Sequence, residues 1–192
     1  MQSKILTPKF IFVTMAILLA AISRLLPHPP NFTPIAAMAL FGGAGMVNKK
    51  FAFIIPLLAM FISDCIIQLI SGTGFHNTMF FVYACFALTV WLGFRLRENN
   101  TAGRTILLSV ISACIFFIVT NLATWWFEGT NGAPLYTHDL SGLISCFVAA
   151  IPFYNNSVFG SFFLNTILGD LFYCGILFGS LYFAKSKFPA LA

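Results

Sequence analysis

Charged side chains are scarce in this chain of 192 residues: only 8% are Asp, Glu, Lys or Arg, whereas 59% are hydrophobic. Soluble domains carry about 25% charged residues. A soluble protein of the present composition could not cover its surface with groups that water solvates, but a lipid bilayer would cover it. The composition therefore predicts one integral membrane domain over residues 1–192, with little chain left for a soluble domain.

Motifs of common catalytic and nucleotide-binding sites are also absent. The sequence contains no phosphate-binding loop, G-x-G-x-x-G, H-E-x-x-H or G-x-S-x-G, the patterns that build nucleotide, zinc and serine-nucleophile sites. Its five cysteines include no C-x-x-C pair, and an odd number without a spacing pattern argues against a disulfide framework. The net charge is +5, and the basic residues lie in short clusters between apolar runs. We expect no enzyme activity, no cofactor of its own and no nucleic-acid partner.

Six apolar segments make up most of the chain, and a membrane-spanning helix needs about 20 such residues. The predicted spans are residues 10–26, 34–47 (a short one), 51–70, 78–94, 104–127 and 159–184. Residues 140–153 are apolar but short for a span, and are expected to form an interfacial or re-entrant helix. No convincing small-residue cleavage site follows the first segment, so we expect a retained helix rather than a signal peptide. The predicted fold is an all-α bundle of six transmembrane helices with a short interfacial helix before the last one.

Basic residues indicate how this bundle is oriented. With six spans, every basic residue except Arg24 falls on one side of the membrane: Lys4, Lys9, Lys49, Lys50, Arg95, Arg97, Arg104, Lys185 and Lys187. Cytoplasmic loops carry the excess of Lys and Arg, so both termini are predicted to be cytoplasmic in a bacterial inner membrane. The opposite, outer side gathers the other polar and interfacial side chains: His28, His76, His138, Glu128, Asp139, Trp125, Trp126, Tyr136 and Tyr154.

Three ionisable residues lie inside predicted spans: Arg24, Asp64 and Asp170. A charge at membrane depth costs several kcal/mol unless it is paired or hydrated, which makes such residues functional candidates. One interpretation is a structural ion pair that joins Arg24 to either Asp64 or Asp170. The other is direct contact with a substrate.

Small residues recur at four-residue spacing in three of the predicted spans. The pairs are Ala16 with Ala20, Ala39 with Gly43, and Gly175 with Gly179. Such pairs let helices approach closely in lipid. They predict either packing inside the bundle or a face on which a partner membrane subunit docks.

Histidine and cysteine supply the candidate metal ligands. His28 lies between Pro27 and Pro29, which restrict the backbone around it, whereas the wide spacing of the three outer histidines favours ordinary solvated loops over a shared metal site. Cys85 lies about two turns from the outer end of the fourth span. By itself it is typical of a packed cysteine.

The segment from residue 23 to 43, SRLLPHPPNFTPIAAMALFGG, is the most distinctive part of the sequence. It resembles the substrate-binding S-components of energy-coupling factor (ECF) vitamin transporters, and within that group the solitary cobalamin-specific type known as BtuM. Shorter matches extend the resemblance over most of the chain: Ser63-Asp64, Val82-Tyr83, Thr120-Asn121, Ala150-Ile151-Pro152-Phe153 and Gly169-Asp170.

This resemblance implies a six-helix fold that binds cobalamin or a related corrinoid in an outward-facing cavity. It implies that Ala16 and Ala20 meet the transmembrane coupling subunit of an ATP-driven module, unless the protein works alone. The residues expected around the ligand are His28, Asn31, Phe32, His76, Tyr83, Cys85 and Asn121. Imidazole and thiolate both bind transition metals, so His28 and Cys85 are predicted as the axial ligands of the corrinoid cobalt. Chemistry on that axial ligand would be the one possible enzymatic step.

Three alternatives remain open at this point. The protein could be an S-component-like carrier of another vitamin or a metal. It could be a membrane enzyme that uses Asp64, Asp170 and a histidine as acid and base, or a scaffold that packs through its small-residue pairs and binds no ligand.

Overall fold

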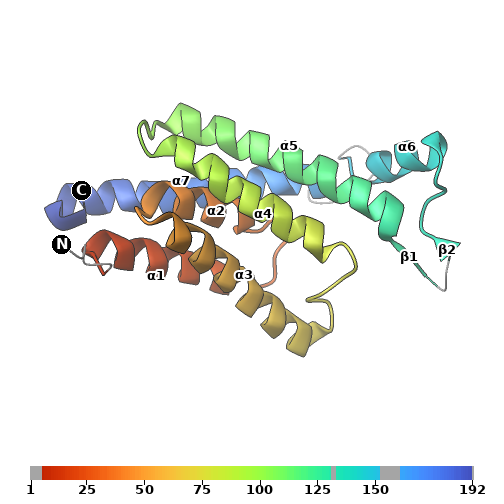
Figure 1. Ribbon diagram of the computed structural model, residues 1–192, viewed down its shortest axis with the longest axis horizontal. Helices are drawn as coiled ribbons and strands as arrows, with labels where there is room; N and C mark the ends of the chain where they lie inside the picture. The colour runs from red at the N-terminus through yellow and green to blue at the C-terminus, as the bar shows by residue number, and fades with distance from the viewer. Residues whose placement is uncertain (1–5, 131–132, 152–160, 192) are drawn as a thin grey trace.

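The computed structural model describes residues 6–130, 133–151 and 161–191. Most of them are helical (Figure 1). The helices are α1 (Pro8–Ser23), α2 (Ile35–Gly45), α3 (Lys49–Ser71), α4 (Met79–Gly93), α5 (Ala102–Phe127), α6 (Leu140–Ala149) and α7 (Phe162–Lys187). Two 3-10 turns, η1 (Phe94–Leu96) and η3 (Pro189–Leu191), follow α4 and α7. A two-residue hairpin pairs β1 (Gly129–Thr130) with β2 (Ala133–Pro134).

Among the described residues, four helical segments are long and apolar enough to cross a bilayer: α3, α4 with η1, α5 and α7. Helices α1, α2 and α6 are apolar but shorter. The chain is therefore an all-α protein of the multi-pass membrane type. The predicted interfacial helix begins at Leu140 as expected, and Asp139 caps it by accepting a hydrogen bond from the Gly142 amide (2.7 Å). That bond, with one from Thr137, holds the pKa of the Asp139 carboxyl below its usual range.

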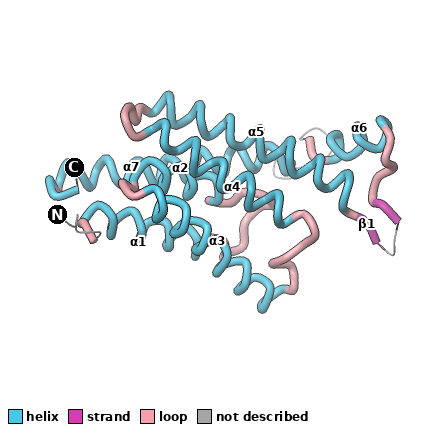
Figure 2. The backbone as a smooth tube through the Cα atoms, viewed as in Figure 1, coloured by secondary structure: helices cyan, strands magenta, loops and turns pink. Residues whose placement is uncertain are grey.

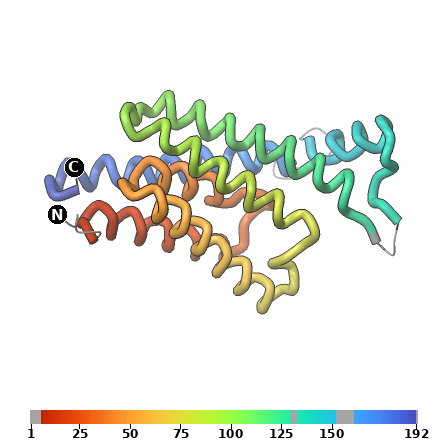
Figure 3. Tube along the Cα trace, in the orientation of Figure 1, coloured from red at the N-terminus to blue at the C-terminus, as the bar shows by residue number. Residues whose placement is uncertain are grey.

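Helix α2 lies at the centre of the bundle and contacts α1, α3, α4, α5 and α7 (Figures 2 and 3). Eight of its eleven residues are buried. Because neighbouring helices surround it, this helix has little surface to present to lipid, and its backbone polar groups can be satisfied within protein. This position explains how so short and small-residue-rich a segment can belong to the bundle.

Helices α2 and α4 approach each other closely where they cross. A Cβ atom added to Gly43 would lie 2.3 Å from the Val90 carbonyl oxygen and 2.9 Å from the Gly93 Cα. Ala39 is fully buried on the same helix. The Ala39–Gly43 pair therefore packs inside the bundle, which is one of the two interpretations given above for such pairs.

The other two small-residue pairs behave differently. Ala20 is buried in the protein's own core and Ala16 packs partly against it, whereas the exposed residues of α1 are large: Ile11, Met15, Leu18, Leu19 and Ile22. Ala20 is therefore part of the protein's own core, whereas Ala16 is only partly buried. Gly175 and Gly179 line an open groove between α5 and α7, where an added Cβ would meet no atom within 4 Å.

Helix ends follow local sequence signals, with small shifts from the expected bounds. Helix α1 ends at Ser23 rather than near residue 26, and Leu25 and Leu26 continue in tight turns to Ile22 and Ser23. Pro27 disfavours helix in the residue before it. Helix α3 ends at Ser71, and Gly72 caps it with a φ of 72°, the left-handed conformation that glycine adopts at helix C-termini. Helix α7 runs on to Lys187, which places Lys185 and Lys187 in its last turn.

Both termini lie at one end of the bundle, at the left of Figure 1. The side chains of Lys9 in α1 and Lys185 in the last turn of α7 face each other. Arg97 does more than orient the chain, because its guanidinium donates to the Gly43 and Met46 carbonyls at 2.8 and 2.6 Å. A cation at a helix C-terminus satisfies carbonyls left without intrahelical partners, so Arg97 caps α2.

Some of the expected features fall outside the described residues: Lys4, Pro152, Phe153, Tyr154, and the predicted start of the last span at Phe159. The described part of that span begins at Phe162, where Ser161 accepts a hydrogen bond from the Leu164 amide (3.0 Å). A serine in this position is a favourable N-cap.

Candidate functional site

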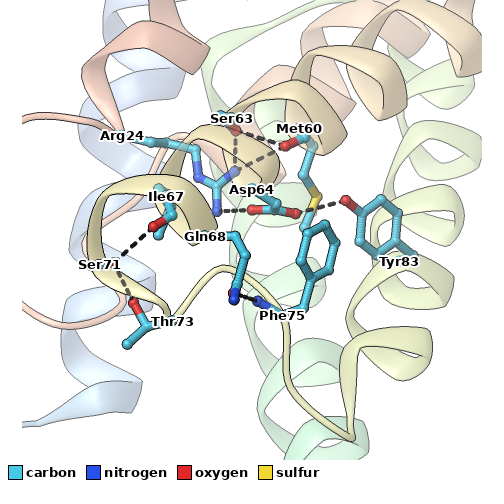
Figure 4. Close-up of polar contacts among 10 residues, drawn as sticks. All are labelled: Arg24, Met60, Ser63, Asp64, Ile67, Gln68, Ser71, Thr73, Phe75 and Tyr83. Atoms are coloured by element: carbon cyan, nitrogen blue, oxygen red, sulfur yellow. Dashed lines mark hydrogen bonds and ion pairs between the residues drawn. The ribbon is translucent and has the colours of Figure 1, made fainter.

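A buried ion pair joins α1 to α3. The Arg24 guanidinium lies 2.7 Å from the Asp64 carboxylate, and the two side chains are 9% and 2% exposed. Arg24 also donates to Ser63, and Tyr83 of α4 donates to the second oxygen of Asp64 at 2.6 Å (Figure 4). Of the two partners proposed for Arg24, the structure therefore selects Asp64. The cluster holds three helices together at membrane depth.

The loop between α3 and α4 folds back onto this cluster. The Gln68 side chain accepts a hydrogen bond from the Phe75 amide (3.1 Å), and Ser71 bonds to Thr73 (2.7 Å), as Figure 4 shows. A Cβ atom on Gly74 would lie 2.1 Å from the Asp64 carbonyl oxygen, so only glycine allows the loop to approach α3 this closely. The ion pair is thereby covered by a loop that is held in place.

A cavity of about 200 Å³ lies beside the ion pair. Polar residues from the α1–α2 and α3–α4 loops line it, and apolar and hydroxyl side chains of α3, α4, α5 and α7 line the rest. Three charged residues reach it: Arg24, Asp64 and Asp170. The cavity thus combines an apolar wall with a small number of charged and polar groups, as ligand sites usually do.

Asp170 stands apart from the ion pair. Its side chain is 2% exposed, faces the backbone N–H of Ala36 at the N-terminus of α2, and lines the cavity. The Ala36 N–H at this helix N-terminus can supply one hydrogen bond to the Asp170 carboxyl. Its Oδ2 atom has no hydrogen-bond partner among the described residues.

Three of the residues expected around a ligand meet at this cavity: Asn31, His76 and Cys85. Asn31 has a φ of 62°, an unusual conformation for a residue other than glycine. The His76 ring bonds to Thr78 at 2.8 Å, and Cys85 is buried. Tyr83 reaches the site only through its hydrogen bond to Asp64.

The remaining candidates lie outside the cavity lining. His28 is exposed, and its Nδ1 lies 2.9 Å from the Pro29 carbonyl oxygen. Phe32 packs against Phe172 and Tyr173 of α7, with ring centroids 5.6 and 6.1 Å away. Asn121 donates to the Phe117 carbonyl on its own helix. The structure therefore does not place His28 and Cys85 together at one cavity.

Metal ligands are not grouped in the described part of the chain, which holds no cluster of three His, Cys, Asp or Glu side chains. Of the three histidines, only His76 lines the cavity, while His138 stacks on Trp126 at 4.8 Å.

Sequence reasoning missed several hydroxyl residues that line the cavity: Thr89, Ser112 and Thr166. Each bonds back to a carbonyl of its own helix, at 2.8 Å in every case. In the sequence these residues are visible only as hydroxyl side chains within apolar spans. Many such hydroxyls only donate a hydrogen bond to a carbonyl of their own helix, so this signal does not single out a site.

Comparison with known proteins adds a family to this description. A model described as a family of unknown function (DUF6580) matches residues 4–191. The chain belongs to this family. No curated protein and no solved structure matches the chain.

Proposed function

We propose that this protein is the substrate-binding membrane subunit of an uptake system, of the ECF S-component type. Six segments would cross the bilayer, with α1 and α2 as the two short ones and both termini in the cytoplasm of a bacterial cell. The protein binds its ligand in the cavity beside the Arg24–Asp64 pair. It then works with an ATP-driven coupling module or alone.

One observation carries this proposal: the charged side chains of Arg24, Asp64 and Asp170 converge on one cavity, which residues of the α1–α2 and α3–α4 loops also line. A scaffold gains nothing from such a cavity, because polar groups inside a membrane protein are costly. A membrane enzyme would need a nucleophile, acid or base in reach of one another. In the described residues Asp64 is engaged by Arg24 and Tyr83, and no hydrogen bond or ion pair joins any two of Asp170, His76 and Cys85, which also line the cavity.

A corrinoid is the ligand that the sequence resemblance implies. The cavity of about 200 Å³ is smaller than the roughly 300–1,000 Å³ typical of sites for drug-sized ligands. A corrinoid would therefore occupy it only if the loops that carry Asn31 and His76 move apart. In that case Cys85 would approach the cobalt from the buried side.

The visible spectrum of the purified protein tests the corrinoid. After incubation with cobalamin and removal of free ligand, the wild-type protein should keep the coloured ligand, and Cys85→Ser should shift its cobalt-sensitive bands. His28→Ala should shift them only if the exposed α1–α2 loop closes over the ring. Absence of retained colour would remove the corrinoid as the ligand.

Topology provides a separate test of the six-span arrangement. A reporter fused to the C-terminus, or inserted between Glu98 and Arg104, should report a cytoplasmic location, because basic residues flank both places. A reporter inserted within residues 133–137 should report an extracytoplasmic location. A cytoplasmic result at residues 133–137 would contradict six spans.

A further inference from the structure

We propose that the ligand of this cavity presents a positively charged nitrogen to Asp170, carried on a compact apolar body. This inference rests on the proposed function, since it takes the cavity as the ligand site, and it narrows the chemistry of the ligand.

Asp170 has a carboxyl oxygen without a hydrogen-bond partner among the described residues. This oxygen is Oδ2, and the Asp170 side chain is almost fully buried and lines the cavity. A buried carboxylate oxygen without a donor is costly. A donor that enters the cavity would supply the missing hydrogen bond.

No side chain of the described residues supplies that hydrogen bond or forms an ion pair with Asp170. Arg24 is the one Lys or Arg in the cavity lining, and it is paired with Asp64, Ser63 and the Met60 carbonyl. His76 also lines the cavity, but no ion pair joins it to a carboxylate in the described part of the chain. The other described Lys and Arg residues do not line the cavity.

Charge and shape then define the ligand. Arg24 and Asp64 balance each other in their ion pair, so Asp170 is the acidic residue of the lining with which a single positive charge on the ligand would pair. The apolar wall includes Met60, Met79, Val82, Phe86 and Phe116. Such a wall favours an apolar body, and an aromatic ring favours a cation over its face. The volume of about 200 Å³ limits that body to a small one.

A bare metal ion fits these observations less well. Hard cations take six or more oxygen ligands, and the described residues hold no group of three His, Cys, Asp or Glu side chains around the cavity or elsewhere. An organic cation needs only the one carboxylate.

Calorimetric titration of the full-length protein in lipid nanodiscs tests the inference with two matched pairs of probes. The pairs are cyclopentylammonium with cyclopentanol, and benzylammonium with benzyl alcohol. We expect the ammonium member of at least one pair to bind about tenfold or more tightly than its alcohol, the range of a hydrogen bond to a charged group. Asp170→Asn should abolish this preference. Asp139→Asn makes the same change outside the cavity and should retain it.

Each outcome decides between the two proposals. An ammonium preference that Asp170→Asn removes supports the inference, as does protection of Cys85 from a thiol reagent by the bound ammonium, which needs no variant. Equal binding of ammonium and alcohol to the wild type, or a preference that survives in Asp170→Asn, overturns it. Retention of cobalamin without any ammonium preference overturns the inference but leaves the proposed function standing. Failure of cobalamin and all four probes to bind overturns both.

Discussion

Replacing Gly43 with alanine is expected to destabilise the protein by about 3 kcal/mol, the upper part of the range for overpacked cores. The added Cβ would lie 2.3 Å from the Val90 carbonyl oxygen and 2.9 Å from the Gly93 Cα. Both contacts are backbone atoms, so the strain can be relieved only by moving α2 away from α4. Thermal unfolding of the purified protein in detergent should show a midpoint lowered by about 6–12 °C, given roughly 2–4 °C per kcal/mol at this chain length.

Gly175 provides the matched control for this prediction. It lies inside α7, where an added Cβ would meet no atom within 4 Å. Because alanine favours helix over glycine by about 1 kcal/mol, Gly175→Ala should leave the unfolding midpoint unchanged or raise it. Opposite effects of the same substitution at the two positions would establish the close crossing of α2 and α4. A Gly43→Ala protein as stable as the wild type would contradict it.

Removing Arg24 is expected to cost about 3–5 kcal/mol, because it leaves a buried carboxylate without its cation. In Arg24→Met, Asp64 would keep the hydrogen bond from Tyr83 but lose the ion pair at 2.7 Å. The yield of folded protein and its unfolding midpoint should both fall. Arg104→Met is the control, since this arginine is exposed, and exposed substitutions usually change stability by no more than about 0.5 kcal/mol.

The double variant Arg24→Met/Asp64→Asn tests the source of the cost of removing Arg24. That cost comes either from the lost attraction to Asp64 or from the buried charge that Asp64 then carries without a partner. An asparagine has no charge to strand, and its side-chain oxygen can still accept from Tyr83. We expect the double variant to be more stable than Arg24→Met alone, a non-additive result typical of residues in direct contact. If the double variant were the less stable of the two, the cost of removing Arg24 would not come from the charge on Asp64.

Several features of the site were visible in the sequence because they depend on residue type and local order. Arg24, Asp64 and Asp170 are noticeable as charges within apolar runs, and such charges are rare enough in membranes to mark a site or an ion pair. Asn31, His76 and Cys85 were candidates through the resemblance, and they do meet at one cavity. Their meeting depends on how three separate segments pack, which no local pattern encodes.

Two expectations show where local reasoning stops. The Ala16–Ala20 spacing permits close approach of a helix, but it cannot say which helix approaches, and Ala20 is buried in the protein's own core. Similarly, His28 belongs to the most distinctive segment of the sequence, yet its side chain is exposed and does not line the cavity. The burial of Ala20 depends on the rotation of α1 about its axis, and the exposure of His28 depends on the path of the loop after α1.

The amino-acid sequence by itself determined that this is a helical membrane protein and indicated the approximate bounds of its helices. These properties depend on hydropathy, proline, glycine and capping residues, which act over a few neighbouring positions. Only the tertiary structure decided that Arg24 pairs with Asp64, that Arg97 caps α2, and that Asp170 faces a cavity instead of a cation. Those partners are far apart in the chain, so the packing of the helices against one another selects them.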